Sequence, residues 1–217
     1  MNKFVIAALA AMTMTTTPAS AAAIINFAND ADTNGERGVS SGSIVTIDGI
    51  NLRLSDYPGA ASPYFTADNA GLGICQVLTA NDLCNPDDDS SVTQGETLEI
   101  LFLNEAFSSF QFRRDILGIA FRDADHNLLG AAGNDGMVNV QTSSGTLTET
   151  FSYFIAAAAN GDAFFKNTKF IRLGYVDTSF YLSSLNIPGV PVPAALPLML
   201  SGIAGLGFAS RRRKRVK

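Results

Sequence analysis

Three stretches of the sequence carry oxygen-bearing side chains at spacings that suit a hard cation. Residues 30–35, Asp-Ala-Asp-Thr-Asn-Gly, place oxygens at positions 1, 3 and 5 and a glycine at position 6, as in the first half of an EF-hand calcium loop. Position 12 is Ser41 instead of a bidentate glutamate, so the second half of the ligand set is incomplete. The stretch is therefore either a Ca²⁺ site or an exposed turn after the first strand, and the ligands would be Asp30, Asp32 and Asn34.

A second stretch, Asp-Ala-Asp-His-Asn at 123–127, has the same spacing but carries Leu128 where the loop needs glycine. Its possible Ca²⁺ ligands are Asp123, Asp125 and Asn127, and the alternative is a turn between strands. The three aspartates at 87–89 are either a solvated acidic loop or a further calcium site. Apart from Ca²⁺, no cofactor is expected.

Catalytic patterns are weak by comparison. His126 is the only histidine, and it lies in an acidic, turn-like stretch without a neighbouring nucleophile motif. The sequence has no glycine-rich phosphate loop and no zinc signature. We therefore expect a protein that is not an enzyme.

The elements that must position these residues are β-strands. Apolar residues alternate with polar or smaller ones over short stretches separated by Gly, Asn, Asp and Ser, which predicts roughly eight to ten strands. Residues 43–55 change parity at Asp48-Gly49, a strong signal for a type I′ hairpin. The other expected strands cover 97–102, 110–113, 117–121, 137–142, 147–154, 170–176 and 180–187, with at most a helical turn at 156–159. This pattern favours an all-β fold, an antiparallel β-sandwich resembling a jelly roll, as one domain over residues 22–189.

The N-terminus has the pattern of a secretory signal peptide. A short positive start is followed by an apolar run at 4–12 and by small residues at 18–23. Cleavage is expected after Ala21 or after Ala23, and an uncleaved anchor is disfavoured because the apolar run is too short to span a membrane.

Export makes the charge informative by region. Lys3 and six residues of the tail account for seven of the 15 basic residues, which leaves eight basic and all 20 acidic residues in 22–189, a net charge of −12. Such a passenger disfavours nucleic acid and anionic lipid as partners, and suits solubility or divalent cations.

The two cysteines, Cys75 and Cys84, enclose eight residues. In an exported domain they are expected to form a disulfide. The alternatives are free thiols or a metal site, and no neighbouring histidine completes a ligand set.

The C-terminal residues read as a membrane segment with a basic end. Residues 194–210 are 17 uncharged residues, which as a helix would cover about 26 Å of a hydrocarbon core about 30 Å thick. The basic residues that follow would stay on the cytoplasmic side and leave the passenger outside; they are Arg211, Arg212, Arg213, Lys214, Arg215 and Lys217. A buried soluble helix is the alternative, but three glycines make it unfavourable.

The motif Val190-Pro191-Val192-Pro193-Ala194, followed by this apolar stretch and arginine cluster, resembles the PEP-CTERM sorting signal, close to its Val-Pro-Leu-Pro-Ala subclass. The resemblance covers about an eighth of the chain. It implies recognition and cleavage near the motif by an exosortase, a membrane protein with Cys, His and Arg in its active site. Val192 departs from the Glu of the family's naming motif and from the Leu of the subclass.

Together these features predict an exported, non-catalytic surface or extracellular-matrix protein. It would meet the secretion machinery, signal peptidase and an exosortase, be held in the inner membrane by its tail, and then reach the cell surface or the medium of a bacterium with an outer membrane. The alternative function is carbohydrate binding, with exopolysaccharide as the ligand and with or without a requirement for calcium. A hydrolase is less favoured. The chain lacks Trp, so the aromatic platforms for sugar rings would be Tyr57, Tyr64, Tyr175 and Tyr181.

Overall fold

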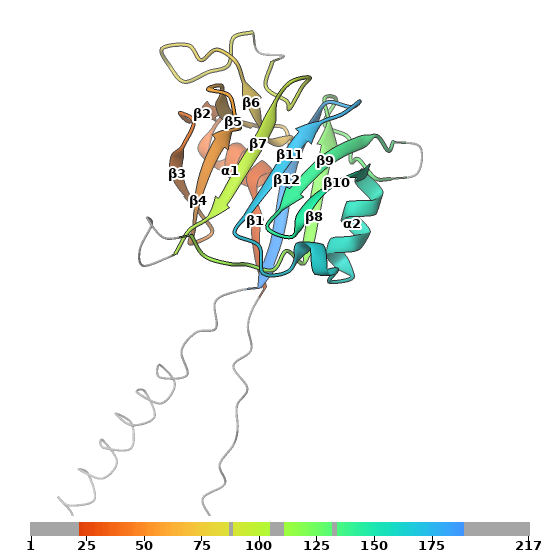
Figure 1. Cartoon of the computed structure of the whole chain (residues 1–217). Coiled ribbons are helices and arrows are strands. Elements are labelled where there is room, and N and C mark those ends of the chain that lie inside the picture. The colour runs from red at the N-terminus through yellow and green to blue at the C-terminus, as the bar shows by residue number, and fades with distance from the viewer. Residues whose placement is uncertain (1–21, 87–88, 105–110, 132–133, 189–217) are drawn as a thin grey trace, which may run out of the picture. The chain divides into compact units, whose positions relative to one another are not determined.

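Two antiparallel sheets dominate the computed structural model, which describes residues 22–86, 89–104, 111–131 and 134–188 (Figure 1). The first, sheet A, contains β1 (Ala22–Asn26), β12 (Phe180–Pro188), β6 (Gly71–Cys75), β5 (Ser62–Thr66) and β2 (Arg37–Gly38) in that order, with β8 (Gly118–Asp123) paired to β12. The second, sheet B, has the order β10 (Gly145–Thr150), β9 (Met137–Thr142), β11 (Phe170–Tyr175), β7 (Thr97–Phe102), β4 (Ile50–Asp56) and β3 (Ser43–Ile47). The predicted all-β, antiparallel architecture is confirmed, with twelve strands among the described residues.

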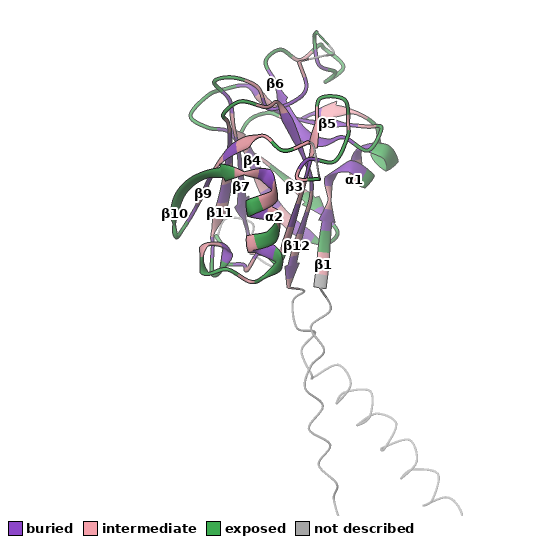
Figure 2. Cartoon of the chain, turned by 90° about the vertical axis from the view of Figure 1, so that its right-hand side faces the viewer, coloured by how far each residue is buried: buried purple, intermediate pink, exposed green. Residues whose placement is uncertain are grey.

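One large apolar core lies between the sheets, and Tyr64, Cys75 and Cys84 form a separate small cluster. On β7 the side chains of Leu98, Ile100 and Phe102 are fully buried, and on sheet A Leu182 and Leu185 of β12 enter the same large core. Burial alternates most clearly along β4 and β9, because successive side chains point to opposite faces of a sheet. Figure 2 shows the contrast between such strands and β10, which is exposed over most of its length.

The predicted hairpin is present. Ile47 of β3 pairs with Ile50 of β4, and the two residues between them have positive φ angles, 51° at Asp48 and 78° at Gly49. Positive φ at both central positions is the requirement of a type I′ turn, which explains the Asp-Gly pair in the sequence.

A helix replaces the end of one expected strand. Alternation predicted a strand over 147–154, but β10 ends at Thr150 and α2 (Phe151–Ala159) begins there. Thr150 caps the helix by accepting a hydrogen bond from the Tyr153 N–H, while Phe151 and Phe154 are buried at a spacing that also fits a helix. The alanines that follow favour the helix, so capping and propensity together outweigh the alternation.

Phe151 explains how α2 is anchored. Its ring centroid lies 4.9 Å from that of Phe121 on β8 and 5.4 Å from that of Phe180 on β12, both in edge-on geometry. The helix thereby contributes to the core at the side of the sandwich formed by β8 and β10, both of which it contacts.

Two other expectations were wrong. Residues 30–34, expected as an exposed turn or a Ca²⁺ loop, belong to a helix, α1 (Phe27–Asn34), with Asn26 as its N-cap and Phe27 and Ala31 buried. The strand expected at 110–113 is absent from the part of it that is described, 111–113, where Gln111 makes only an isolated bridge to Leu103. A short 3₁₀ helix, η1 (Ala163–Phe165), precedes β11.

The disulfide between Cys75 and Cys84 is confirmed. It links the end of β6 to the loop that follows, where Leu78 also forms a bridge with Cys84. Both half-cystines are buried, so the disulfide that joins the loop to β6 is shielded from solvent.

The expected signal peptide at 1–21 and the sorting signal at 190–217 lie outside the described residues. Among the residues that are described, no helix is long and apolar enough to cross a membrane.

Replacing both cysteines, as Cys75→Ala with Cys84→Ala, is expected to lower the free energy of unfolding by about 2 to 3 kcal/mol, because the closed loop restricts the unfolded chain. Denaturant unfolding with and without reductant measures this. Reductant should lower the free energy of unfolding of the unmodified protein and leave that of the double variant unchanged. Labelling of both thiols in the absence of reductant would contradict the bridge.

Candidate functional site

One candidate site is a depression of about 650 Å³ on the outer face of sheet B. Burial of Ile100, Ile171 and Val140 on the inner face turns the alternate residues of the same strands outward. The strand registers then align Glu99 of β7, Arg172 of β11 and Gln141 of β9 in one row across the sheet. The depression is lined by this row together with Leu101, Gln111, Arg113, Thr142, Ser143, Ser144, Gly145, Lys169 and Phe170.

Arg172 is the centre of the row. Its Nε donates to Glu99 Oε2 at 2.5 Å and its Nη1 donates to Gln141 Oε1 at 3.1 Å. The guanidinium carbon also lies 3.4 Å from the centroid of the Tyr57 ring and 4.8 Å from that of Phe170. Hydrogen bonds in the plane and aromatic contacts over it fix the orientation of the guanidinium group.

Fixing Arg172 leaves part of its hydrogen-bonding capacity unused. A guanidinium group has five N–H donors, and contacts among the described residues use two of them. The side chains of Arg172 and Glu99 retain 19% and 10% exposure, so the pair is partly buried yet reachable from the depression.

The depression is positively charged relative to the rest of the domain. Three of the eight basic residues of 22–189 line it, namely Arg113, Lys169 and Arg172, against Glu99 as the acidic residue among its described lining. Glu99 is already paired with Arg172. Arg53 of β4 lies opposite Leu101 and extends the basic surface by one strand.

A second depression, of about 620 Å³, contains the only histidine. Its lining includes Glu36, Asp68, Asp125, His126 and Tyr181. His126 adopts a positive φ of 64° in a turn, and its ring meets the edge of the Tyr181 ring at 5.5 Å. Ser90, the serine in this lining, forms a hydrogen bond through its Oγ with Tyr181 Oη at 2.8 Å. The described residues therefore assemble no Ser-His-Asp chain here.

The stretch at 123–127 forms the predicted turn. Asp123 accepts hydrogen bonds from the N–H groups of Asp125 and Asn127, and from the side-chain amide of Asn134 at 2.8 Å. Partial burial acts to raise the pKa of Asp123, but the hydrogen bonds outweigh it and hold the pKa below its ordinary value. The carboxylate oxygens are thus engaged by donors, while the Asp125 side chain points to solvent.

The first candidate calcium site is not a loop. Asp30 and Asn34 lie one turn apart on α1 and bond to each other at 2.8 Å, and Asp30 also forms an ion pair with Arg37. Asp32 faces elsewhere and accepts from the Asn69 N–H. The structure brings two of the three residues together, but as a helix-surface contact and not as a cage.

No group of three or more His, Cys, Asp or Glu side chains is placed to hold a metal ion in the described part of the chain. Of the acidic stretch 87–89, only Asp89 is described, and it accepts a hydrogen bond from the Gln76 N–H. The motif residues 190–194 and the basic residues 211–217 are outside the described ranges.

The four tyrosines proposed as sugar platforms separate into different environments. Tyr64 and Tyr181 are buried, with 1% and 4% exposure, and Tyr175 is half-buried. Tyr57 alone among the four lies in the open, at 43% exposure, beside Arg172. Sequence reasoning missed Arg172 and Glu99 as site residues. Alternation along the strand could have predicted that Arg172 faces solvent, but no sequence pattern predicts its pairing with Glu99, which lies 73 residues away.

Comparison with protein-family models found no match, and comparisons with curated proteins and with solved structures likewise found none. The function of the outer face of sheet B therefore has to be inferred from its own chemistry.

Asp123→Ala should lower the free energy of unfolding by about 1 kcal/mol at neutral pH, because the N–H groups of Asp125 and Asn127 and the side-chain amide of Asn134 lose a charged acceptor. Since the folded-state pKa of Asp123 is lowered, its contribution is complete above the unfolded-state pKa and is lost as the pH falls through the folded-state value. The difference from the unmodified protein should therefore shrink on acidification, as measured by denaturant unfolding over a pH series.

Asp125→Ala is the matched control, since it removes an exposed carboxylate from the same turn. It should change stability little. Equal losses for the two variants, or a loss that persists undiminished at low pH, would contradict the role given to Asp123.

Proposed function

We propose that the chain is an exported, non-catalytic protein of the cell surface or extracellular matrix, delivered by its C-terminal sorting signal. The observation that carries this proposal is the pairing of the first and last described strands. Ala22 of β1 is opposite Pro188 of β12, so both ends of the described chain leave from the same end of the domain (Figure 1). The disulfide-linked loop lies at the other end, as the yellow segment in Figure 1 shows.

This arrangement suits a passenger with removable segments at both termini. The last strand ends at Pro188, two residues before the motif begins at Val190, so cleavage within 190–194 removes no strand residue. At the other end β1 begins at Ala22, and cleavage after Ala21 preserves all of it. Cleavage after Ala23 would remove two residues that pair with Pro188 and Ile187, which favours the earlier position.

In this proposal the secretion machinery and signal peptidase act first, and the membrane holds residues 194–210 until an exosortase cuts near Val190 to Ala194. The basic residues 211–217 stay on the cytoplasmic side. The passenger is a sandwich of jelly-roll type, a topology supported by a chain that passes repeatedly between the sheets: β3 and β4 in B, β5 and β6 in A, β7 in B, β8 in A, β9 to β11 in B, and β12 in A.

Carbohydrate binding is the second candidate function. One observation favours it: the open depression on sheet B is lined by Phe170 and polar side chains, and Tyr57 lies next to it in contact with Arg172. Ring faces next to amide and charged groups are the combination that sugar rings require, because the apolar faces of sugars stack while their hydroxyl groups form hydrogen bonds.

Mass spectrometry of both termini of the protein recovered from cells tests the main proposal. We expect a mature chain that begins at Ala22 and ends within 190–194, without Lys217. Pro191→Ala combined with Pro193→Ala should retain Lys217 and keep the protein in the membrane fraction.

Pro188→Ala is the matched control, because it replaces a proline outside the motif and should leave processing unchanged. Surface-exposed wild-type protein with an intact Lys217 would overturn the proposal. Normal processing of the double variant would show that the prolines are not what is recognised.

A further inference from the structure

We infer that the outer face of sheet B binds an acidic polysaccharide, whose carboxylate groups contact Arg113, Lys169 and Arg172. This binding role presupposes the carbohydrate-binding candidate function described above, and it specifies the ligand class and the residues that recognise it.

The distribution of charge carries the first step. The domain has 20 acidic and eight basic residues, yet three of the eight basic ones gather around one depression and Arg53 extends their surface. Like charges gathered on one face of a protein of opposite net charge repel each other, and a bound anion relieves that repulsion.

The second step concerns which of these charges are already used. Arg172 is neutralised by Glu99, and Arg113 donates from Nη1 to the Asn167 carbonyl at 3.2 Å. The ammonium group of Lys169 and the guanidinium group of Arg53 have no hydrogen bond or ion pair with any described residue. The outer face of sheet B therefore presents two uncommitted cations, Lys169 in the depression and Arg53 on the neighbouring strand β4, near a guanidinium group of fixed orientation.

The orientation of Arg172 supplies geometry as well as charge. Stacking on Tyr57 and the bonds to Glu99 and Gln141 leave N–H donors without a partner, and a fixed guanidinium group loses little conformational entropy when it binds a carboxylate. The side-chain amides of Gln111 and Gln141 line the same surface and match sugar hydroxyl groups, which both donate and accept.

The shape and place of the depression separate a polysaccharide from other polyanions. An acidic peptide added as a strand needs a free sheet edge, whereas this surface is the face of the central strands β7, β11 and β9. The net charge of −12 repels every polyanion at long range, so the choice among them depends on contacts within the depression. A chain of sugar acids combines carboxylates with apolar ring faces that pack beside Tyr57 and Phe170 and with hydroxyl groups that match Gln111 and Gln141.

Polygalacturonate is the probe, with neutral dextran, poly-glutamate and single-stranded DNA as comparisons. The exported protein is recovered from cells and its affinity is measured from retardation in gels that contain each polymer. Every variant has the same termini, so the readout is the difference between variants. We expect polygalacturonate to retard the wild-type protein, with an effect that decreases as salt is added, and the other three polymers to retard it much less.

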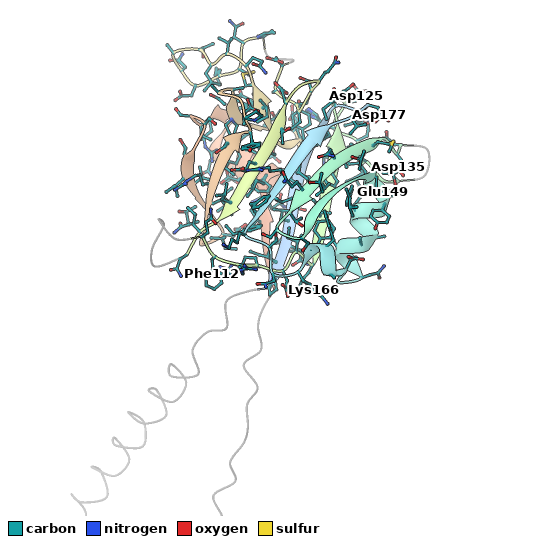
Figure 3. All side chains as sticks on the ribbon, viewed as in Figure 1. Phe112, Asp125, Asp135, Glu149, Lys166 and Asp177 are labelled. Atoms are coloured by element: carbon teal, nitrogen blue, oxygen red, sulfur yellow. A yellow bond between two sulfur atoms is a disulfide. The ribbon has the colours of Figure 1, made fainter. Side chains whose placement is uncertain are left out.

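Lys169→Ala should weaken binding roughly threefold to tenfold, and adding Arg113→Ala should weaken it further and reduce the salt dependence, as expected when charged contacts are lost. Lys166→Ala is the control, an exposed lysine three residues away that does not line the depression and lies at the lower edge of the view in Figure 3. Arg172 is left unchanged because its loss would leave Glu99 without its partner. Lys169→Glu, a single change at a half-buried surface residue, provides a second variant if the double one is unstable.

Four results would overturn the inference: no retardation by polygalacturonate, equal retardation by dextran, equal retardation by poly-glutamate or DNA, or an equal loss for Lys166→Ala and Lys169→Ala. The outcome is separable from the processing test. A protein that loses its tail but ignores polygalacturonate would refute only the binding site, and a protein that binds through Lys169 while retaining Lys217 would refute only the processing.

Discussion

Strand β12 is the element on which sheet A depends. It pairs with β8 along one side and with β1 and β6 along the other, and its side chains at Leu182, Leu185 and Ile187 are fully buried. β12 is the last described strand. Sheet A can therefore form completely only after the chain has been synthesised as far as Pro188. The β12 partner β1 is the first strand, so folding must bring together residues separated by most of the domain, a long-range closure that is slow compared with local pairing.

The same two-residue alternation that fills the core also constructs the outer face of sheet B. Once Ile171 and Leu173 point inward, Phe170 and Arg172 have no alternative but to point outward. The hydrogen-bonded register then decides which residues become neighbours, and it places Glu99 and Gln141 on either side of Arg172. A site built on central strands is held by the core beneath it, which keeps its geometry independent of what happens at the two termini.

Local signals in the sequence predicted the parts of the fold that depend on local chemistry. Asp48-Gly49 specified a hairpin because its turn needs positive φ angles, and the two cysteines, taken with the predicted export of the domain, specified their own bridge. The strand prediction was wrong at residues 151–154 because the sequence there fits both the spacing of a helix, at Phe151 and Phe154, and the alternation of a strand. The helix is selected by the N-cap at Thr150, whose hydrogen bond is seen only in the structure. The pairing of Arg172 with Glu99 follows from sheet order, which no local pattern contains.

The acidic composition has a structural explanation that changes how it should be interpreted. Asp135 accepts a hydrogen bond from the Ser152 N–H at the start of α2, and Asp177 accepts one from the Met137 N–H at the start of β9; both aspartates are labelled in Figure 3. Asp162 accepts a hydrogen bond from the Phe164 N–H in η1. Asp115 and Asp123 do the same for Asn167 and Asn127. Short carboxylates serve loops in this way because they reach the backbone donors that loops leave unpaired. Much of the negative charge is thus engaged within the fold, which weakens the case for divalent cations, whereas Lys169 and Arg53 are not engaged among the described residues. Exposed carboxylates such as Asp125 and Glu149 are spread over other parts of the domain, whereas Lys169 and Arg53 lie together on the outer face of sheet B.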